Sequence, residues 1–396
     1  SLTLTGNSSF GGTLSSNGTG GLLITNGANV AWGGATTLSA LDGSLSVTGG
    51  SIAISGGATT LGRNTLLIDG TNSVFSTTAL SSSILGAGSG IVNVANGGTL
   101  RLTAGNLTMR ALGGGTAISA LRISGMNSLV DVSGGLLGAN AAAANIFEAT
   151  ISAGATLRTA GASQIGIATS TQPLAVTITG AGSNWTSTGS LAMTAGTFTL
   201  DQGGAASFAS ASFGASGTPM TVSVTGIGSS LATTSGDLVL GSGTGIGSLD
   251  LSNGGSANIG GSLLVGAGST VALSGGSARV GGNLVVGTAS GNGALTLANG
   301  SSVDVTGNLV LGTGAGMGEL VLASGNTVNV GGSLILADNT GATGILSIGA
   351  ADGSRMPDAP GAFTATTLAF GSAGSILNFN HDAADYVFAA AISGSG

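Results

Sequence analysis

Residues 307–337 read GNLVLGTGAGMGELVLASGNTVNVGGSLILA, and the repeat inside this stretch decides the fold. The aliphatic segment LVLG at 309–312 returns as LILA at 334–337, and LVVG at 284–287 precedes it at the same spacing. The period is thus about 25 residues, within the range of about 20 to 50 that is typical of a solenoid. The units of a solenoid bury their apolar face only by stacking on neighbours.

Each repeat contains two further strand-like segments. LTL at 295–297 returns as LVL at 320–322, and VDV at 303–305 returns as VNV at 328–330. Three short strands separated by Gly-rich corners are too few for the four-stranded sheet of a propeller blade, and the repeat contains no helix. The sequence therefore predicts an all-β, right-handed parallel β-helix with three short strands per rung of about 25 residues, and the hand follows from the general rule for parallel crossovers.

The regularity of the repeat divides the chain into three parts. We expect residues 1–236 to form irregular β-helix rungs with variable arms, because similar strand-like segments recur there at less regular spacing. Residues 237–349 carry the regular repeat, apart from one shorter step between Leu263 and Leu284. We expect residues 350–396 to begin with an exposed loop, since DGSRMPDAPG at 352–361 is rich in proline and charge, and then to continue the rungs.

Composition excludes several classes of function. Net charge is −7, which argues against a nucleic-acid partner, because phosphates need a basic patch. The chain has no cysteine, so it has neither disulfides nor thiolate metal sites. No apolar run reaches the roughly 18 residues of a membrane-spanning helix. The first residues, SLTLTG, are already strand-like, so we expect a mature or excised segment of a longer protein. Within this segment we expect no membrane span.

A second phrase, a strand followed by G-x-x-S and an apolar residue, recurs in the less regular part. It occurs as LLIDGTNSVF at 66–75, LRISGMNSLV at 121–130, VTITGAGSNW at 176–185 and VSVTGIGSSL at 222–231. Trp185 ends the third copy where the others have Phe75, Val130 and Leu231. We interpret this position as interior, and a platform on which a sugar stacks is the alternative for Trp185.

One stretch departs from the strand pattern. GANAAAANIFEAT at 138–150 has the alanine content and the length of a short helix that protrudes from the stack.

Alternation of side chains along the strands predicts which residues face outward. In VDV and VNV the valines point inward, so stacked rungs place four polar residues in one external row. These are Asn258, Arg279, Asp304 and Asn329. We expect a cross-rung ion pair between Arg279 and Asp304, and the row as a whole reads as a solvated face.

The same argument places an aliphatic row on the outside of the LVLG-type strand. Its members are Val239, Leu264, Val285, Val310 and Ile335. Either a corner, a loop or a bend of the strand covers this row, or it is a docking stripe for self-association or for another segment of the same protein.

The sequence contains none of the motifs that carry common chemistries. We find no nucleophile elbow, phosphate-binding loop, zinc-protease helix or calcium loop, so no catalytic residue, metal ligand or cofactor is assigned. The single histidine, His381, stands beside Asp382 and Asp385 in FNHDAADY, which we interpret as a turn with surface carboxylates. The acidic residues are scattered, whereas β-helical polysaccharide lyases and hydrolases need converging carboxylates. We therefore do not expect an enzyme.

Two features resemble the passenger domains of bacterial autotransporters, which are secreted through their own C-terminal barrel. One is the strand repeat at 307–337. The other is the segment APGAFTATTLAFGSAGSILNFNHDAADYVFAAAISGSG at 359–396, which is similar to what such passengers show shortly before the barrel. The resemblance implies a β-helix displayed on the surface of a Gram-negative bacterium, anchored through a β-barrel that this sequence does not include. It also implies roles in adhesion, aggregation or biofilm formation, and the absence of cysteine suits the family.

We therefore expect a non-enzymatic, extracellular passenger that mediates adhesion, self-association or biofilm formation. Its expected partners are a second copy, a host surface or an abiotic surface, with a polysaccharide as a further candidate. Three alternatives stay open: a carbohydrate-active β-helix enzyme, a passive stalk, and a two-partner-secretion exoprotein of the same fold. The enzyme alternative requires three or more residues of one set to converge within reach of one sugar: Asp352, Asp358, His381, Asp382, Asp385 and Arg355.

Overall fold

The computed structural model describes residues 2–12, 14–16, 21–34, 36–38, 44–57, 59–61, 65–85, 90–112, 117–138, 145–167, 174–215 and 217–394. The chain divides into two compact units. Unit 1 comprises Ser1–Ala192 and Gly203–Phe208, and unit 2 comprises Met193–Gln202 and Ala209–Gly396. Each unit is described by itself below.

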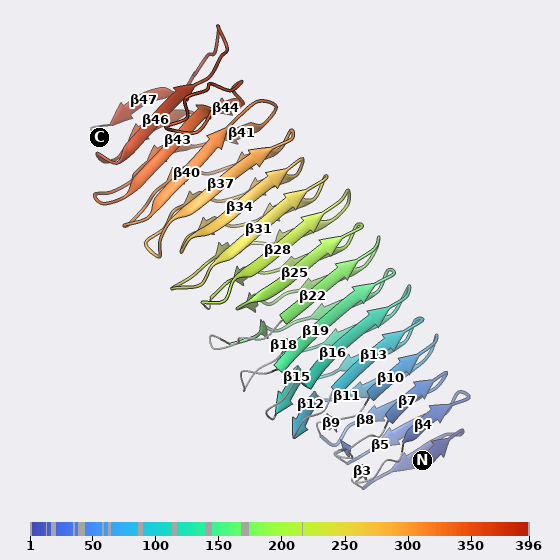
Figure 1. The fold of residues 1–396 in the computed structure, drawn as a ribbon. Coiled ribbons are helices and arrows are strands. Elements are labelled where there is room, and N and C mark those ends of the chain that lie inside the picture. Colours follow the sequence, from blue (N-terminus) through green and yellow to red (C-terminus); the bar gives the residue numbers. More distant parts are fainter. Residues whose placement is uncertain are drawn as a thin grey trace. The chain divides into compact units, whose positions relative to one another are not determined.

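The described residues form strands and no helix, and in both units the strands belong to three parallel sheets, A, B and C. The chain visits the sheets in the order A, B, C and then returns to A one layer further on, so each unit is a β-solenoid with three strands per turn. Figure 1 shows successive sheet A strands lying side by side within each unit. The fold class predicted from the repeat is confirmed.

Unit 1 is built from short strands in all three sheets. Its sheet A contains β1 (Leu2–Leu4), β4 (Leu22–Thr25), β7 (Ser44–Thr48), β10 (Thr65–Asp69), β13 (Gly90–Ala95), β16 (Ala117–Ser124), β19 (Asn145–Ser152) and β22 (Leu174–Thr179). Its sheet B contains β2 (Ser8–Phe10), β5 (Asn29–Trp32), β8 (Ser51–Ile54), β11 (Val74–Thr77), β14 (Thr99–Leu102), β17 (Leu129–Val132), β20 (Thr156–Thr159), β23 (Asn184–Ser187) and β26 (Ala205–Phe208). Its sheet C contains β3 (Leu14–Ser16), β6 (Thr36–Leu38), β9 (Thr59–Leu61), β12 (Leu80–Leu85), β15 (Leu107–Leu112), β18 (Leu136–Gly138) and β21 (Ser163–Ile165).

Unit 2 repeats the same arrangement, and β24 (Leu191–Met193) lies where the two units divide. Its sheet A contains β25 (Gly196–Asp201), β28 (Met220–Thr225), β31 (Gly247–Ser252), β34 (Ser269–Ser274), β37 (Gly293–Ala298), β40 (Met317–Leu322), β43 (Thr343–Gly349) and β46 (Ser375–Asn380). Its sheet B contains β29 (Ser230–Thr233), β32 (Ser256–Ile259), β35 (Ser277–Val280), β38 (Ser302–Val305), β41 (Thr327–Val330) and β44 (Ala362–Thr364). Its sheet C contains β27 (Ala211–Phe213), β30 (Leu238–Leu240), β33 (Leu263–Val265), β36 (Leu284–Val286), β39 (Leu309–Leu311), β42 (Ser333–Leu336), β45 (Thr367–Phe370) and β47 (Ala391–Gly394).

The register of sheet C agrees with the sequence repeat. Leu284 pairs with Leu309, and Leu309 pairs with Leu334, so residues one period apart lie in adjacent layers. The shorter step is accommodated as well, because Leu263 pairs directly with Leu284. The missing residues of that turn therefore come from its corners, while the strands keep their alignment.

The interior of the coil is lined by the alternate apolar residues of each strand. In the second phrase, the final apolar position is interior in all four copies, since Phe75, Val130, Trp185 and Leu231 are each 0 % exposed. The interior placement of Trp185 is thus confirmed, and its ring meets Phe208 edge to face at a centroid distance of 5.1 Å. Burying such large side chains supplies much of the stability of the stack.

The G-x-x-S phrase forms the corner between sheets A and B. In each copy the serine N–H donates a 3.1 Å hydrogen bond to the glycine carbonyl three residues earlier. The residue before the serine has φ between 65° and 86°, which fits a type II turn and explains why it is always asparagine or glycine. The four turns cover residues 70–73, 125–128, 180–183 and 226–229.

The serine of this corner links one turn of the coil to the next. Ser128 is 1 % exposed, and its Oγ donates to the Ser124 carbonyl at 2.7 Å and accepts from the Gly97 N–H at 2.9 Å. Ser183 accepts from the Gly154 N–H at 2.9 Å in the same way. A buried hydroxyl needs such hydrogen-bond partners. The serine recurs in the phrase because its hydroxyl bonds to backbone groups of the corner that would otherwise lack a partner.

The helix expected at 138–150 is wrong where the structure describes it. Gly138 ends β18, and residues 145–150 belong to β19, while residues 139–144 lie outside the described part of the chain. β19 pairs in parallel with β16 on one side and β22 on the other. The hydrogen bonds of two neighbouring strands and the burial of Phe147 and Ile151 outweigh the helix propensity of the alanines.

Within the part of the chain that the structure describes, no helix is long and apolar enough to cross a membrane.

Candidate interaction surface

The five aliphatic residues expected on the outside of sheet C lie in one unbroken column of unit 2. Val239 pairs with Leu264, Leu264 with Val285, Val285 with Val310 and Val310 with Ile335. Each is the middle residue of its LVL-type triplet, between two fully buried neighbours. We call these five residues the aliphatic column.

The aliphatic column is partly accessible to solvent. Four of its members are half-buried, and Val310, in the fourth layer, is 9 % exposed. Ser212 precedes the column and Ala369 follows it in the same register. The column is therefore partly accessible at Val239, Leu264, Val285 and Ile335 and buried at Val310.

No charged residue occurs in the sheet C strands of unit 2. The charged strand residues of this unit lie elsewhere: Asp201, Asp250 and Glu319 on sheet A, and Arg279 and Asp304 on sheet B. Burial raises the pKa of the Asp250 carboxyl, because desolvation penalises its ionised form. The strands of sheet C are thus uncharged in a unit that is otherwise acidic, although the exposed Asp237 directly precedes β30.

The equivalent column of unit 1 has different chemistry. Thr60 pairs with Ser81, Ser81 with Thr108, Thr108 with Leu137 and Leu137 with Gln164. Four of these five residues carry a hydroxyl or an amide. We call them the polar column of sheet C.

The polar row expected on sheet B of unit 2 is aligned and exposed. Asn258 pairs with Arg279, Arg279 with Asp304, and Asp304 with Asn329. Asn329 donates to Asp304 through Nδ2 at 2.8 Å and accepts from the Thr364 hydroxyl at 3.0 Å. The expected ion pair is wrong: although the structure describes both residues and pairs them in register, Arg279 and Asp304 do not form one, and Asp304 instead binds the asparagine of the next layer.

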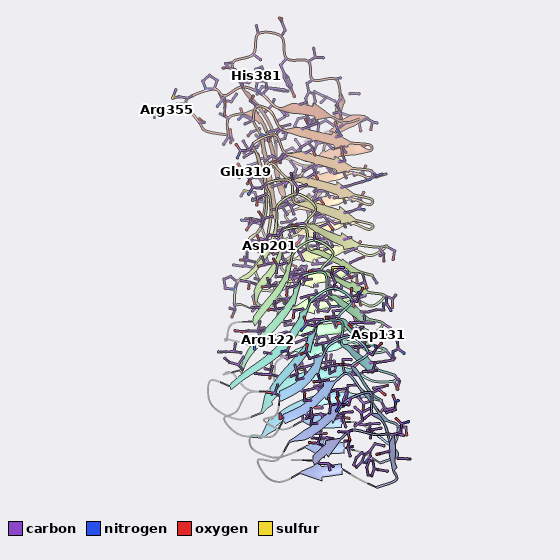
Figure 2. All side chains as sticks on the ribbon, turned by 90° about the vertical axis from the view of Figure 1, so that its right-hand side faces the viewer. Arg122, Asp131, Asp201, Glu319, Arg355 and His381 are labelled. Carbon is purple, nitrogen blue, oxygen red and sulfur yellow. The ribbon has the colours of Figure 1, made fainter. Side chains whose placement is uncertain are left out.

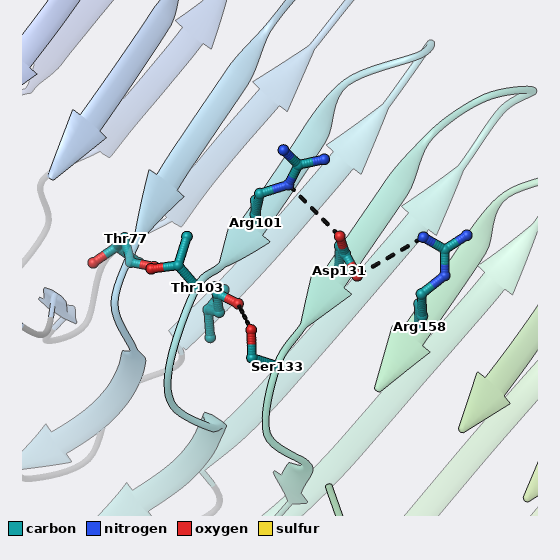
Figure 3. Close-up of polar contacts among 7 residues, drawn as sticks. Thr77, Arg101, Thr103, Asp131, Ser133 and Arg158 are labelled. Carbon is teal, nitrogen blue, oxygen red and sulfur yellow. Dashed lines mark hydrogen bonds and ion pairs between the residues drawn. The ribbon is translucent and has the colours of Figure 1, made fainter. Parts of the chain in front are cut away.

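The ion pairs that do form among the described residues lie on sheet B of unit 1, and the sequence repeat did not predict them. Asp131 lies between Arg101, at 3.6 Å, and Arg158, at 4.0 Å. Figure 3 shows the three side chains on successive strands, with Asp131 in the middle. The signal was present in TLRL, LVDV and TLRT, but the spacings between these segments do not follow the regular repeat.

Of the residues on which an enzyme would depend, Asp358 and His381 are brought together, because an isolated parallel β-bridge pairs their backbones. The ring of His381 lies 5.1 Å from that of Tyr386 and 6.2 Å from that of Phe379. Its Nδ1 is buried and makes no hydrogen bond with a described residue. Among the described residues, no three histidine or acidic side chains are placed to hold a metal ion, and Arg355 forms no ion pair. Arg355 and His381 are marked in Figure 2.

Comparison with known proteins adds one structural likeness. No family model and no curated protein matches the chain. A solved structure, that of a TibA fragment hyperglycosylated by TibC, aligns over 98 % of this chain and 100 % of its own length, with 14 % identity and a TM-score of 0.31. The β-solenoid seen in each unit is the fold that a β-helical autotransporter passenger requires.

Proposed function

We propose that this chain is a non-enzymatic, surface-displayed solenoid that mediates adhesion through self-association, and that the aliphatic column on sheet C of unit 2 is the contact surface. The observation that carries the proposal is the alignment of five aliphatic side chains on strands that contain no charged residue. Removing such methyl groups from water stabilises a contact by about 25 cal/mol per Å² of apolar surface.

Electrostatics favours this face over the others for contact between two copies. Unit 2 contains ten acidic residues and only two arginines, so two copies repel each other at most orientations. Like charges brought together across an interface cost several kcal/mol, at an order of magnitude. Sheet C avoids that cost, and a column that runs along the layers can pair with its own copy about a two-fold axis.

An extracellular location on a Gram-negative bacterium is part of this proposal, and it rests on the resemblance of 307–337 and 359–396 to autotransporter passengers. In that setting the solenoid would present many copies side by side on one cell. Weak contacts repeated along each copy then add up to firm adhesion between cells.

The test replaces Val285, Val310 and Ile335 by threonine, which keeps the branch at Cβ while a hydroxyl takes the place of one apolar branch. Self-association of the purified chain, followed by sedimentation velocity over a range of concentrations, should fall in this triple variant. The matched control replaces Thr60, Ser81 and Thr108 of the polar column by asparagine, which leaves the net charge unchanged, and it should associate like the parent. If the threonine triple variant is folded and associates like the parent, the column is not the contact surface.

A further inference from the structure

The outward face of sheet B in unit 1 carries two arginines in one column. Arg101 lies on β14, Asp131 on β17 and Arg158 on β20, and the three residues are paired in register. Layers of a parallel sheet are about 4.8 Å apart, so the two arginines project from backbones about 10 Å apart. Arg122 lies on sheet A, and Figure 2 shows it on a different side of unit 1 from Asp131.

Asp131 leaves most of the arginine donors unused. Arg101 Nε lies 3.6 Å from Asp131 Oδ2, and Arg158 Nη1 lies 4.0 Å from Asp131 Oδ1. Both distances exceed the 2.7–3.2 Å or so of an N–H···O hydrogen bond. The side chains of Arg101 and Arg158 are 55 % and 59 % exposed. Each guanidinium carries five N–H donors, so both can bind an anion from solvent without losing an established hydrogen bond.

The charge around this pair is favourable for an anion. The column has two positive charges and one negative charge, and no other acidic residue lies on a sheet B strand of unit 1. Unit 1 as a whole contains five arginines against four acidic residues. In a chain of net charge −7, the sheet B strands of unit 1 thus carry a net positive charge that attracts an anion.

We propose that Arg101 and Arg158 bind a linear polysaccharide bearing carboxylate or sulfate groups, with the sugar chain lying along the column. Ser76 precedes Arg101 in register, and Thr186 follows Arg158, so hydroxyls flank both arginines. A polysaccharide with spaced anionic groups fits two arginines separated by a carboxylate, because its uncharged part passes over Asp131. This site is independent of the sheet C column.

The same geometry is unfavourable for nucleic acid. A phosphate backbone carries a charge at every nucleotide and is bound through continuous basic tracks, usually with aromatic side chains for stacking. Here Asp131 interrupts the track, and the outward positions of the described sheet B strands β8, β11, β14, β17, β20 and β23 contain no aromatic residue.

The experiment measures binding of the purified chain to immobilised dextran sulfate and polygalacturonate, with neutral dextran as the reference and a single-stranded oligonucleotide as a competitor. Arg101→Gln with Arg158→Gln should weaken binding at least about tenfold, the loss expected from one charge-assisted hydrogen bond. Asp131→Asn removes the competing carboxylate and should strengthen binding. Arg122→Gln with Arg355→Gln makes the same change in net charge on other faces and should leave binding within about twofold.

Circular dichroism establishes that each variant is folded, and the polar replacements of exposed side chains keep the interior intact. The proposal is overturned if the Arg101/Arg158 variant binds like the parent. It is also overturned if the control pair loses as much affinity, since attraction is then a matter of net charge alone. Equal binding of the oligonucleotide through the same arginines would reject a polysaccharide in favour of nucleic acid.

Discussion

Sheet C presents two different surfaces on the two units of this chain. In unit 1 its outward column contains Thr60, Ser81 and Thr108, and in unit 2 the corresponding strands contain Val285, Val310 and Ile335. The inward neighbours in unit 2 are buried apolar side chains, and those in unit 1 are buried as well, with Leu61, Leu107 and Met109 beside the polar Thr59. The coil therefore depends on the inward residues and the corners, and the outward columns are free to carry function.

Charge separates the two units in the same way. Unit 1 has nearly balanced charge, with five arginines and four acidic residues, whereas unit 2 has two arginines and ten acidic residues. The comparison assigns anion binding to sheet B of unit 1 and apolar contact to sheet C of unit 2.

The largest effect is expected where the shared coil is broken at a corner. Gly312 has φ of 81°, and a Cβ at this position would lie 2.1 Å from the Thr343 carbonyl oxygen. Gly312→Ala should therefore destabilise the protein by about 2–4 kcal/mol through strain and backbone displacement. Chemical unfolding followed by circular dichroism measures the loss.

The next turn supplies a control for that corner. Ala337 occupies the equivalent position and already has φ of 51°. Ala337→Gly should change the free energy of unfolding by less than about 1 kcal/mol. If both substitutions had equal effects, the corner would not constrain the coil as described.

Much of this fold could be predicted from sequence because the repeat and the alternation are local signals. The regular spacing placed Leu284, Leu309 and Leu334 in adjacent layers, and alternation placed Val285 between inward-facing neighbours. The prediction of a helix at 138–150 failed because it rested on alanine content, which reflects helix propensity alone. Pairing of β19 with the strands of the turns before and after it is not visible in that window.

Exchanging column chemistry should transfer association from one unit to the other. Thr60→Val, Ser81→Val and Thr108→Val, introduced together, give unit 1 an aliphatic surface of the same β-branched shape. In the background of the threonine triple variant of unit 2, these changes should restore part of the lost self-association, because apolar area is again removed from water. Sedimentation velocity gives the comparison, and a set that associates no better than its background would count against the assigned role of aliphatic residues.

Added salt should strengthen self-association through unit 2 and weaken polysaccharide binding to unit 1. Raising ionic strength from about 0.01 to 0.15 M shortens the Debye length from about 30 to 8 Å. Repulsion between two copies of unit 2 is then screened, so self-association should increase by about severalfold, while polysaccharide binding to Arg101 and Arg158 should weaken. Light scattering and a binding titration on the same samples measure both, and a parallel response of the two would contradict the assignment.

Electrostatic details were the least predictable part of the surface. The sequence placed Arg279 next to Asp304 correctly, yet the carboxylate accepts a hydrogen bond from Asn329 of the following layer instead. The group of Arg101, Asp131 and Arg158 was missed because its members lie in the part of the chain where the turns differ in length, so no fixed period connects them. Side-chain reach and competing donors decide such contacts, and neither follows from a repeat.

The smallest effect concerns Asp250 on sheet A of unit 2. Burial raises the pKa of this carboxyl above its ordinary value of 3.8. The charged form is thus less favourable in the folded state, so its penalty is absent well below that value and grows as pH rises towards neutrality. Asp250→Asn should stabilise the protein at about pH 7 by about 0.5 kcal/mol or less, after allowing for solvent screening, and the gain should vanish near pH 3. Thermal unfolding at the two pH values shows whether Asp250→Asn raises stability. The substitution would lower stability at about pH 7 if the carboxylate made a favourable interaction.

Cysteine cross-linking tests the association of unit 2 most directly, because the chain has no cysteine of its own. Val285→Cys places one thiol in the middle of the aliphatic column, and Thr108→Cys places one at the polar column of sheet C. With a short bis-maleimide, the account predicts covalent dimers for Val285→Cys and monomers for Thr108→Cys under the same conditions. Dimers that form equally well at Thr108→Cys, or a Val285→Cys protein that stays monomeric where the parent associates, would contradict it.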